Sequence, residues 1–296
     1  MAFEPPQRLV RALGESPDVD SSGWLDRLPE LAEAAALRGE LSVERVHEPG
    51  GRSSLVALVR QADDAPAVLK LAPPAARPDL EAAALAHWDG WGACRLLSAS
   101  DGFLVLERLH PEVSLRALPE AKALLEAAGT VRRLWVEPPA GHGFESVAAR
   151  TERRGSAMAS ADASVRPLVD AALAARAELV ASPDAEVVLL HGEFGQGKVL
   201  AGDRTPWLTV GPSPVVGERA YDLGRLALDR LDDLVASSSG AGTARRRVSK
   251  LADSLEVDRD RARGWTLFRA VDSGTRALRA GRRRQAEVLL EFASWL

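Results

Sequence analysis

The chain has 296 residues, 46% apolar and 27% charged, which fits a soluble globular protein with one large domain or two lobes. Its net charge of -4 argues against bulk nucleic-acid binding, and no apolar run of about 18 residues predicts a membrane span. The single cysteine, Cys94, excludes an internal disulfide framework and fits a reducing cytoplasm. Taken together, these features lead us to expect a cytoplasmic protein that binds neither nucleic acid nor membrane.

The first part of the chain predicts a helical lead-in and then a small antiparallel sheet. Leu25, Leu28, Leu31 and Ala35 have the spacing of one helix face. Short strand-like runs separated by turn residues follow at 41–46, 54–60, 67–71, 95–97 and 103–106. Between the third and fourth runs, residues 79–88 read as a helix for which Asp79 is the expected N-cap.

After Pro111 the pattern becomes mainly helical. Apolar residues recur at helical spacing over 119–135, 144–158, 165–180, 222–236, 244–255 and 259–280. Only the segment 187–210 interrupts these helices. The sequence therefore predicts an α+β chain with a small sheet region followed by a larger helical region.

The interrupting segment carries the most specific motif of the chain. Residues 191–198 read His-Gly-Glu-Phe-Gly-Gln-Gly-Lys, which keeps the spacing of the kinase catalytic loop His-x-Asp-x-x-x-x-Asn. In that loop the Asp accepts the proton of the substrate hydroxyl and the Asn binds magnesium. Here Glu193 stands at the Asp position and Lys198 at the Asn position, so the spacing is present while a metal ligand is absent.

A predicted hairpin follows this loop. Val199-Leu200 and Trp207–Val210 are two short apolar runs around a polar turn. A kinase places a metal-binding Asp directly after the second strand, and this chain has Gly211 there. The order of loop, hairpin and post-strand position thus matches a kinase, whereas the chemical groups differ.

The chain is similar to the aminoglycoside phosphotransferase superfamily in five segments that follow one another in the same order. They are Ala67-Val68-Leu69-Lys70-Leu71, 81–90, 104–109, 189–200 and 214–223. The resemblance is strongest to its streptomycin 6-kinase and hydroxyurea phosphotransferase branch. It implies a bilobal protein-kinase-like α+β fold. Residues 1–108 would form a small antiparallel-sheet N-lobe with one helix, and residues 109–296 a mainly helical C-lobe.

The resemblance also implies site residues. Lys70 with its partner acid Glu81 would hold the phosphates of ATP, and His191 and Asp222 would brace the catalytic loop around Glu193. It also implies Glu107 and Leu109 as hinge positions at the nucleotide. Three further candidates for nucleotide binding come from the residues themselves: the backbone of Ser53 and Ser54 in a turn that could cover phosphates, and the ammonium group of Lys198. A strand-end lysine, a surface acid and a plain hairpin turn at 50–54 are the alternative interpretations of the first-lobe residues.

The departures from the family pattern lead to three functional hypotheses. Because Lys198 and Gly211 replace both metal ligands, the first is a pseudokinase that binds a small molecule, a nucleotide or a protein partner without the ordinary magnesium site. Lys198 could then stand in for the metal, or be merely solvated. The second is an active antibiotic O-phosphotransferase with Glu193 as base. The third is a kinase fold that uses Glu193 and Lys198 as an acid–base pair in another biosynthetic reaction.

Overall fold

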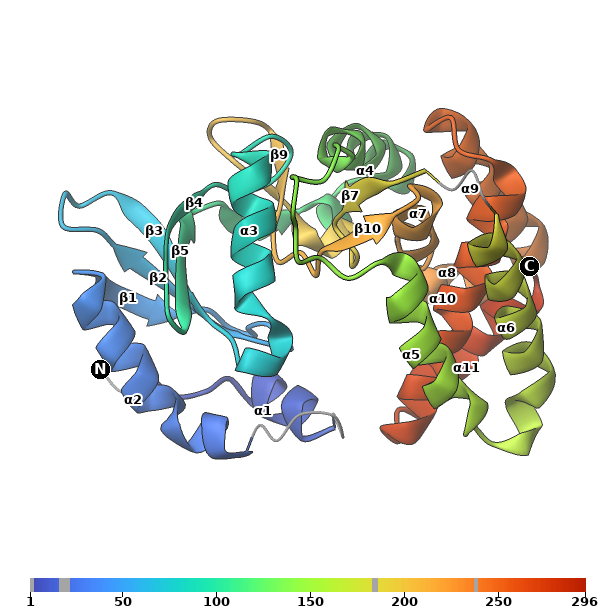
Figure 1. The fold of residues 1–296 in the computed structure, drawn as a ribbon, viewed down its shortest axis with the longest axis horizontal. Coiled ribbons are helices and arrows are strands. Elements are labelled where there is room, and N and C mark those ends of the chain that lie inside the picture. The colour runs from blue at the N-terminus through green and yellow to red at the C-terminus, as the bar shows by residue number, and fades with distance from the viewer. Residues whose placement is uncertain (1–2, 16–21, 183–185, 237–238) are drawn as a thin grey trace. The chain divides into compact units, whose positions relative to one another are not determined.

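The computed structural model describes residues 3–15, 22–182, 186–236 and 239–296, and the chain divides into two compact units (Figure 1). Unit 1 comprises residues 1–111 and 201–210, and unit 2 comprises residues 112–200 and 211–296. Among the described residues, no helix combines the length and the apolar character that crossing a membrane requires.

Unit 1 contains a five-stranded antiparallel sheet in the order β1-β2-β3-β5-β4. The strands are β1 (Ser42–Val46), β2 (Leu55–Arg60), β3 (Pro66–Leu71), β4 (Leu96–Ser100) and β5 (Phe103–Glu107). Two helices precede the sheet, α1 (Gln7–Gly14) and α2 (Ser22–Arg38), and α3 (Pro78–Trp88) lies between β3 and β4 in sequence. The predicted lead-in helices, the five strands and the single helix are thus confirmed, with boundaries shifted by up to three residues.

The two faces of this sheet have different coverings. Along β3, Ala67, Leu69 and Leu71 are buried in a core cluster that also contains buried residues of α1 and α2. Side chains alternate between the faces of a strand, so Lys70 points to the opposite face. Helix α3 packs against β4 and β5, and Lys70 contacts this helix.

The predicted cap of α3 is wrong. The N-cap residue is Arg77, in the left-handed region at a φ of 53°, and it makes no side-chain capping bond. Pro78 occupies the first helical position, where its fixed φ and missing N–H suit a helix start. Asp79 therefore lies inside the first turn, where its carboxylate pairs with the guanidinium of Arg77 at 2.7 Å.

Unit 2 is built around one long helix, α10 (Arg259–Arg279). This helix packs against α5, α6, α7, α9 and α11, and Figure 1 shows it among them. The helices of unit 2 are α4 (Glu120–Leu134), α5 (Val147–Ala159), α6 (Arg166–Ala181), α7 (Ala220–Leu226), α8 (Leu231–Val235), α9 (Gly240–Ser254), α10 and α11 (Arg283–Ser294). The predicted helical region is confirmed, and α11 extends it beyond the predicted segments.

One predicted helix is broken. The segment 222–236 forms two helices, α7 and α8, separated at Arg230, whose φ of 55° lies in the left-handed region. The side chain of Arg230 donates to the side-chain oxygen of Gln196 and to the backbone carbonyls of Leu115, Arg116 and Leu118. These four bonds explain the break, which apolar spacing alone does not reveal.

Strands within and next to the segment 191–217 form two small sheets. Strand β7 (Val188–Leu190) pairs antiparallel with β10 (Val215–Gly217), with Leu190 opposite Val215. A three-stranded sheet has the order β6-β8-β9, from His110–Ser114, Val199–Ala201 and Trp207–Thr209. The predicted hairpin therefore corresponds to the neighbouring strands β8 and β9.

Candidate functional site

The loop at 191–198 begins directly after β7 and is held close to the segment before β10. The backbone N–H of Ser213 donates to the carbonyl of His191 at 2.9 Å. Gly192 has a φ of 77°, and a Cβ added there would lie only 2.0 Å from the carbonyl oxygen of Ser213. This position therefore requires glycine for both its backbone conformation and its space.

Asp222 of α7 holds the start of this loop. Its carboxylate accepts the backbone N–H of His191 at 3.0 Å and that of Gly192 at 2.8 Å, and the indole of Trp135 donates to it at 3.4 Å. Asp222 and His191 are fully buried. Burial raises the pKa of Asp222 to about 6, although the N–H donors oppose this rise.

A second buried carboxylate, Asp229, holds the middle of the loop. It accepts the backbone N–H of Gln196 at 2.6 Å, and a Cβ on Gly195 would lie 2.9 Å from one of its oxygens. The guanidinium of Arg116 is 3.3 Å away. Sequence reasoning missed Asp229, because it lies 33 positions from Gln196 and no local pattern connects the two.

Glu193, the residue at the catalytic-base position, lies among arginines. One oxygen is 3.1 Å from Arg154 of α5, and the other is 3.2 Å from Arg269 of α10 and 3.6 Å from Arg225 of α7. Burial alone would raise the pKa of Glu193, but the positive charges of Arg269, Arg154 and Arg225 hold it well below its usual value of 4.5. The carboxylate is therefore ionised and paired.

Asp272 extends this network along α10. Its carboxylate is 3.2 Å from Arg154 and 3.1 Å from Arg276, and the guanidinium of Arg269 lies over the ring of Tyr221 at 4.5 Å. Sequence reasoning missed these residues too. A signal was present, because positions 269, 272 and 276 share one face of a helix, but nothing in the sequence indicated that this face meets Glu193.

Lys198, which the sequence resemblance assigns to the first metal position, forms a hydrogen bond within unit 2. Its ammonium group donates to the backbone carbonyl of Gly211 at 2.7 Å, so the two residues that the resemblance assigns to metal positions are in contact. Gly211 has a φ of 61°. In the described part of the chain, no group of three or more His, Cys, Asp or Glu residues is arranged to hold a metal ion.

In unit 1, Lys70 of β3 and Glu81 of α3 form a close ion pair. The Lys70 ammonium is 2.5 Å from each carboxylate oxygen, and the side chains are only 11% and 6% exposed. Lys70 and Glu81 therefore form the pair that the sequence predicted. The alternative of a solvated lysine and a solvated surface acid does not fit their low exposure.

The other predicted nucleotide-binding residues of unit 1 have separate environments. Ser53 is exposed and Ser54 is buried, in the turn before β2. The Glu107 carboxylate accepts the backbone N–H of Arg95 at 2.9 Å and pairs with Arg204 at 2.9 Å, and Leu109 is buried. The Glu107 side chain therefore has structural partners of its own.

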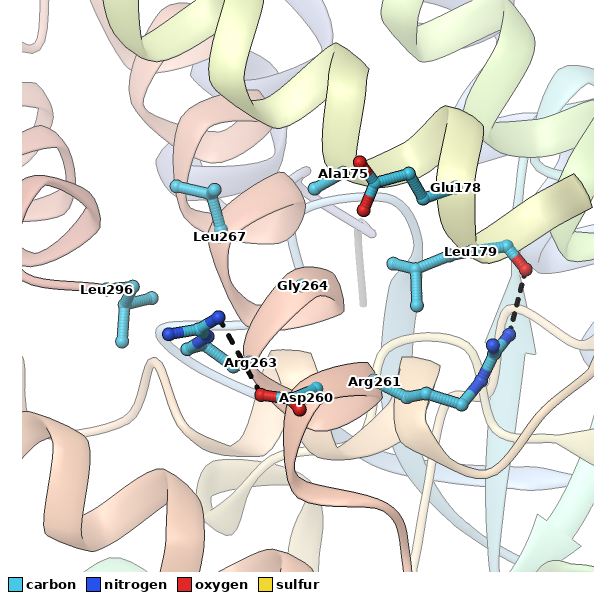
Figure 2. Close-up of a pocket in the computed structure, with 9 residues that line it drawn as sticks. All are labelled: Ala175, Glu178, Leu179, Asp260, Arg261, Arg263, Gly264, Leu267 and Leu296. Carbon is cyan, nitrogen blue, oxygen red and sulfur yellow. Dashed lines mark hydrogen bonds and ion pairs between the residues drawn. The ribbon is translucent and has the colours of Figure 1, made fainter. Parts of the chain in front are cut away.

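Unit 2 also contains an open pocket of about 350 Å³ between α6 and α10 (Figure 2). Arg261 spans one side and donates to the carbonyl of Leu179 at 2.8 Å, while Arg263 lies 3.7 Å from Asp260. None of the residues predicted from the sequence to form the site lines this pocket.

The order of strands and helices, with a braced His-Gly-Glu loop after a short strand, is that of a protein-kinase-like fold. Residues 38–281 match the family model for aminoglycoside/hydroxyurea antibiotic resistance kinases, and the chain belongs to this family. It is 34% identical over 272 residues to a streptomycin 6-kinase of Streptomyces glaucescens, covering 89% of this chain and 86% of that protein. It is also 38% identical over 232 residues to a hydroxyurea phosphotransferase of Kitasatospora aureofaciens, covering 75% and 65%.

Solved structures show the same fold. The aminoglycoside phosphotransferase APH(4)-Ia aligns with a TM-score of 0.62 at 16% identity, covering 89% of this chain and 96% of that one. An APH(3'')-Id from Streptomyces rimosus in complex with ADP and streptomycin aligns with a TM-score of 0.54 at 16% identity, covering 86% and 99%. The predicted α+β protein-kinase-like fold is thus confirmed, and so is the resemblance to the streptomycin-kinase branch.

Proposed function

We propose that this chain is a pseudokinase-like member of the family, which binds a ligand without ordinary magnesium-dependent phosphoryl transfer. The observation that carries this proposal is the pairing of Glu193 with Arg154, Arg225 and Arg269. A general base needs a pKa near the working pH and a lone pair free to accept the substrate proton. The arginines occupy both oxygens of Glu193 and hold its pKa well below that range.

The metal positions support the same proposal. Magnesium takes oxygen ligands in near-octahedral geometry, and kinases supply them from the Asn and Asp positions. Gly211 has no side-chain oxygen, and its backbone carbonyl accepts from the Lys198 ammonium, so neither position that the resemblance assigns to a metal ligand offers a side-chain oxygen. The residues present do not fit the family's two-ligand magnesium site.

Nucleotide binding is the part of the family function that the residues retain. The close Lys70–Glu81 pair has the arrangement with which kinases hold the phosphates of ATP. Within unit 2, the Lys198 ammonium carries the kind of charge that the metal supplies in active relatives. We therefore infer that the ligand of this chain is ATP or another nucleotide, bound without a metal requirement.

A calorimetric titration of ATP into the purified protein, with magnesium and then with EDTA, tests this inference. We expect similar affinities in the two buffers, at least a tenfold loss in Lys70→Ala, and no change in the control Lys122→Ala, which removes an exposed lysine. Binding that requires magnesium would contradict the proposal. The absence of binding would exclude the nucleotide and direct the search to another small molecule or a protein partner.

The competing hypothesis is an active O-phosphotransferase, and the identity of about a third to streptomycin 6-kinases favours it. In that hypothesis Glu193 is the base, and it must leave its arginine partners to accept a proton. The third hypothesis, a different biosynthetic reaction with Glu193 and Lys198 as acid and base, requires the same release. The strength of the Glu193 ion pairs therefore separates these hypotheses from the pseudokinase.

A further inference from the structure

The arginines around Glu193 carry more positive charge than their protein partners neutralise. Four guanidinium groups, those of Arg154, Arg225, Arg269 and Arg276, contact two carboxylates, Glu193 and Asp272. We call these six residues the arginine cluster. Asp229 lies 3.8 Å from Arg225 but also pairs with Arg116, so the charges of Asp229 and Arg116 offset each other.

Asp222 reduces this excess only in part. Arg269 acts electrostatically on Asp222, whose pKa of about 6 leaves it mostly ionised at neutral pH. With Asp222 included, at least one positive charge of the cluster remains uncompensated. The chain as a whole has a net charge of -4, so this local excess does not reflect a generally basic protein.

A second observation points to the same place. Among the described residues, Arg269 is one of the few with a buried side-chain nitrogen that lacks a hydrogen-bond partner, its Nη1. The Arg269 side chain is only 1% exposed. An unsatisfied buried donor costs about 1–3 kcal/mol, and more when the group is charged. A bound acceptor would remove this cost.

Two arginines of the cluster reach solvent, since the side chains of Arg225 and Arg276 are 28% and 47% exposed. The four guanidinium groups come from three helices, α5, α7 and α10. The planar guanidinium fork matches phosphate and carboxylate oxygens. A tetrahedral anion has enough oxygens to bind several converging arginines, whereas a carboxylate has only two.

We propose that the arginine cluster is a binding site for the phosphate group of an anionic small molecule. It would take this group where an active family member holds its catalytic base. The inference deepens the proposed function, since it rests on Glu193 serving as a partner for arginines rather than as a base. None of the residues of the cluster is among those assigned to nucleotide binding, and all of them belong to unit 2.

Titration with inorganic phosphate in buffer free of nucleotide and metal tests this proposal. We expect saturable binding that sulfate competes for and that acetate at equal ionic strength does not. Arg276→Gln should weaken the binding at least tenfold, and Arg225→Gln is a second variant in case the first is unstable. The control is Arg263→Gln, which removes an exposed arginine from the same helix, α10, at the pocket of Figure 2.

Four results would overturn the proposal. The first three are no phosphate binding, equal binding by acetate, and equal affinity in the wild type and both cluster variants. The fourth is selective weakening by Arg263→Gln, which would place the anion in the pocket between α6 and α10. Because neither ATP nor magnesium is present, the outcome is independent of phosphoryl transfer. Turnover of an antibiotic would refute the proposed function without deciding the anion site.

Discussion

Replacing Glu193 with glutamine should lower the free energy of unfolding by about 3 kcal/mol at pH 7. Removing one partner of a buried ion pair costs about 3–5 kcal/mol because the remaining charge stays buried, and the lower end applies here since Glu193 is 26% exposed. Urea unfolding monitored by tryptophan fluorescence measures this difference. If Glu193 were a catalytic base, its replacement should leave the free energy of unfolding unchanged or raise it, because active-site residues are commonly neutral or costly for stability.

The matched control is Glu152→Gln on α5. Glu152 pairs with Arg176 at 2.6 Å but is 67% exposed, so its loss should cost less than about 1 kcal/mol. If Glu193→Gln were as mild as this control, or if it stabilised the protein, Glu193 would not anchor the arginine cluster. The base hypothesis would then be favoured.

The pH dependence of the Glu193 effect has a defined sign. The folded pKa of Glu193 is lowered, so its stabilisation is present above the unfolded value near 4.5 and is lost as pH falls through the lower folded value. The difference in unfolding free energy between wild type and Glu193→Gln should therefore be largest at neutral pH. It should shrink progressively in acid below about pH 4.5.

Gly192→Ala should destabilise the protein by about 2–5 kcal/mol. The left-handed backbone at Gly192 costs about 1–2 kcal/mol for a residue with a Cβ. The new methyl would also lie 2.0 Å from the Ser213 carbonyl oxygen, and relieving such overlap costs about 1–3 kcal/mol more. Thermal and urea unfolding measure the loss.

Gly141→Ala is the control for this variant. Gly141 has a φ of 68°, close to that of Gly192, but a Cβ there would meet nothing within 4 Å. It should show the backbone cost alone, about 1–2 kcal/mol. Equal losses in the two variants would mean that the contact between the catalytic loop and Ser213 relaxes freely, contrary to a tightly braced loop.

Much of the fold could be predicted from the sequence because its signals are local. Alternating residues gave the strands, as in 67–71, and apolar spacing gave α2 and α10. The motif at 191–198 located the loop at once. By contrast, the break at Arg230 depends on where its side chain finds partners, and the start of α3 after Arg77 depends on Pro78; apolar periodicity reports neither.

The site was predictable only in part, for the same reason. The spacing of a known motif identified Glu193, Lys198 and Gly211, whose residue types departed from it. The environment of Glu193 was not predictable, because its partners Arg154, Arg225 and Arg269 come from three helices distant in sequence. The abundance of arginine in this chain hid those three among many similar residues.

A phosphoryl-transfer assay with magnesium and ATP decides whether the chain is a pseudokinase, with streptomycin and hydroxyurea as acceptors and products identified by mass spectrometry. The streptomycin 6-kinase of Streptomyces griseus, 33% identical to this chain, serves as the positive control. We expect no phosphorylated product above the rate without protein. A phosphorylated product that requires magnesium and disappears in Glu193→Ala would contradict the account and establish Glu193 as a catalytic base.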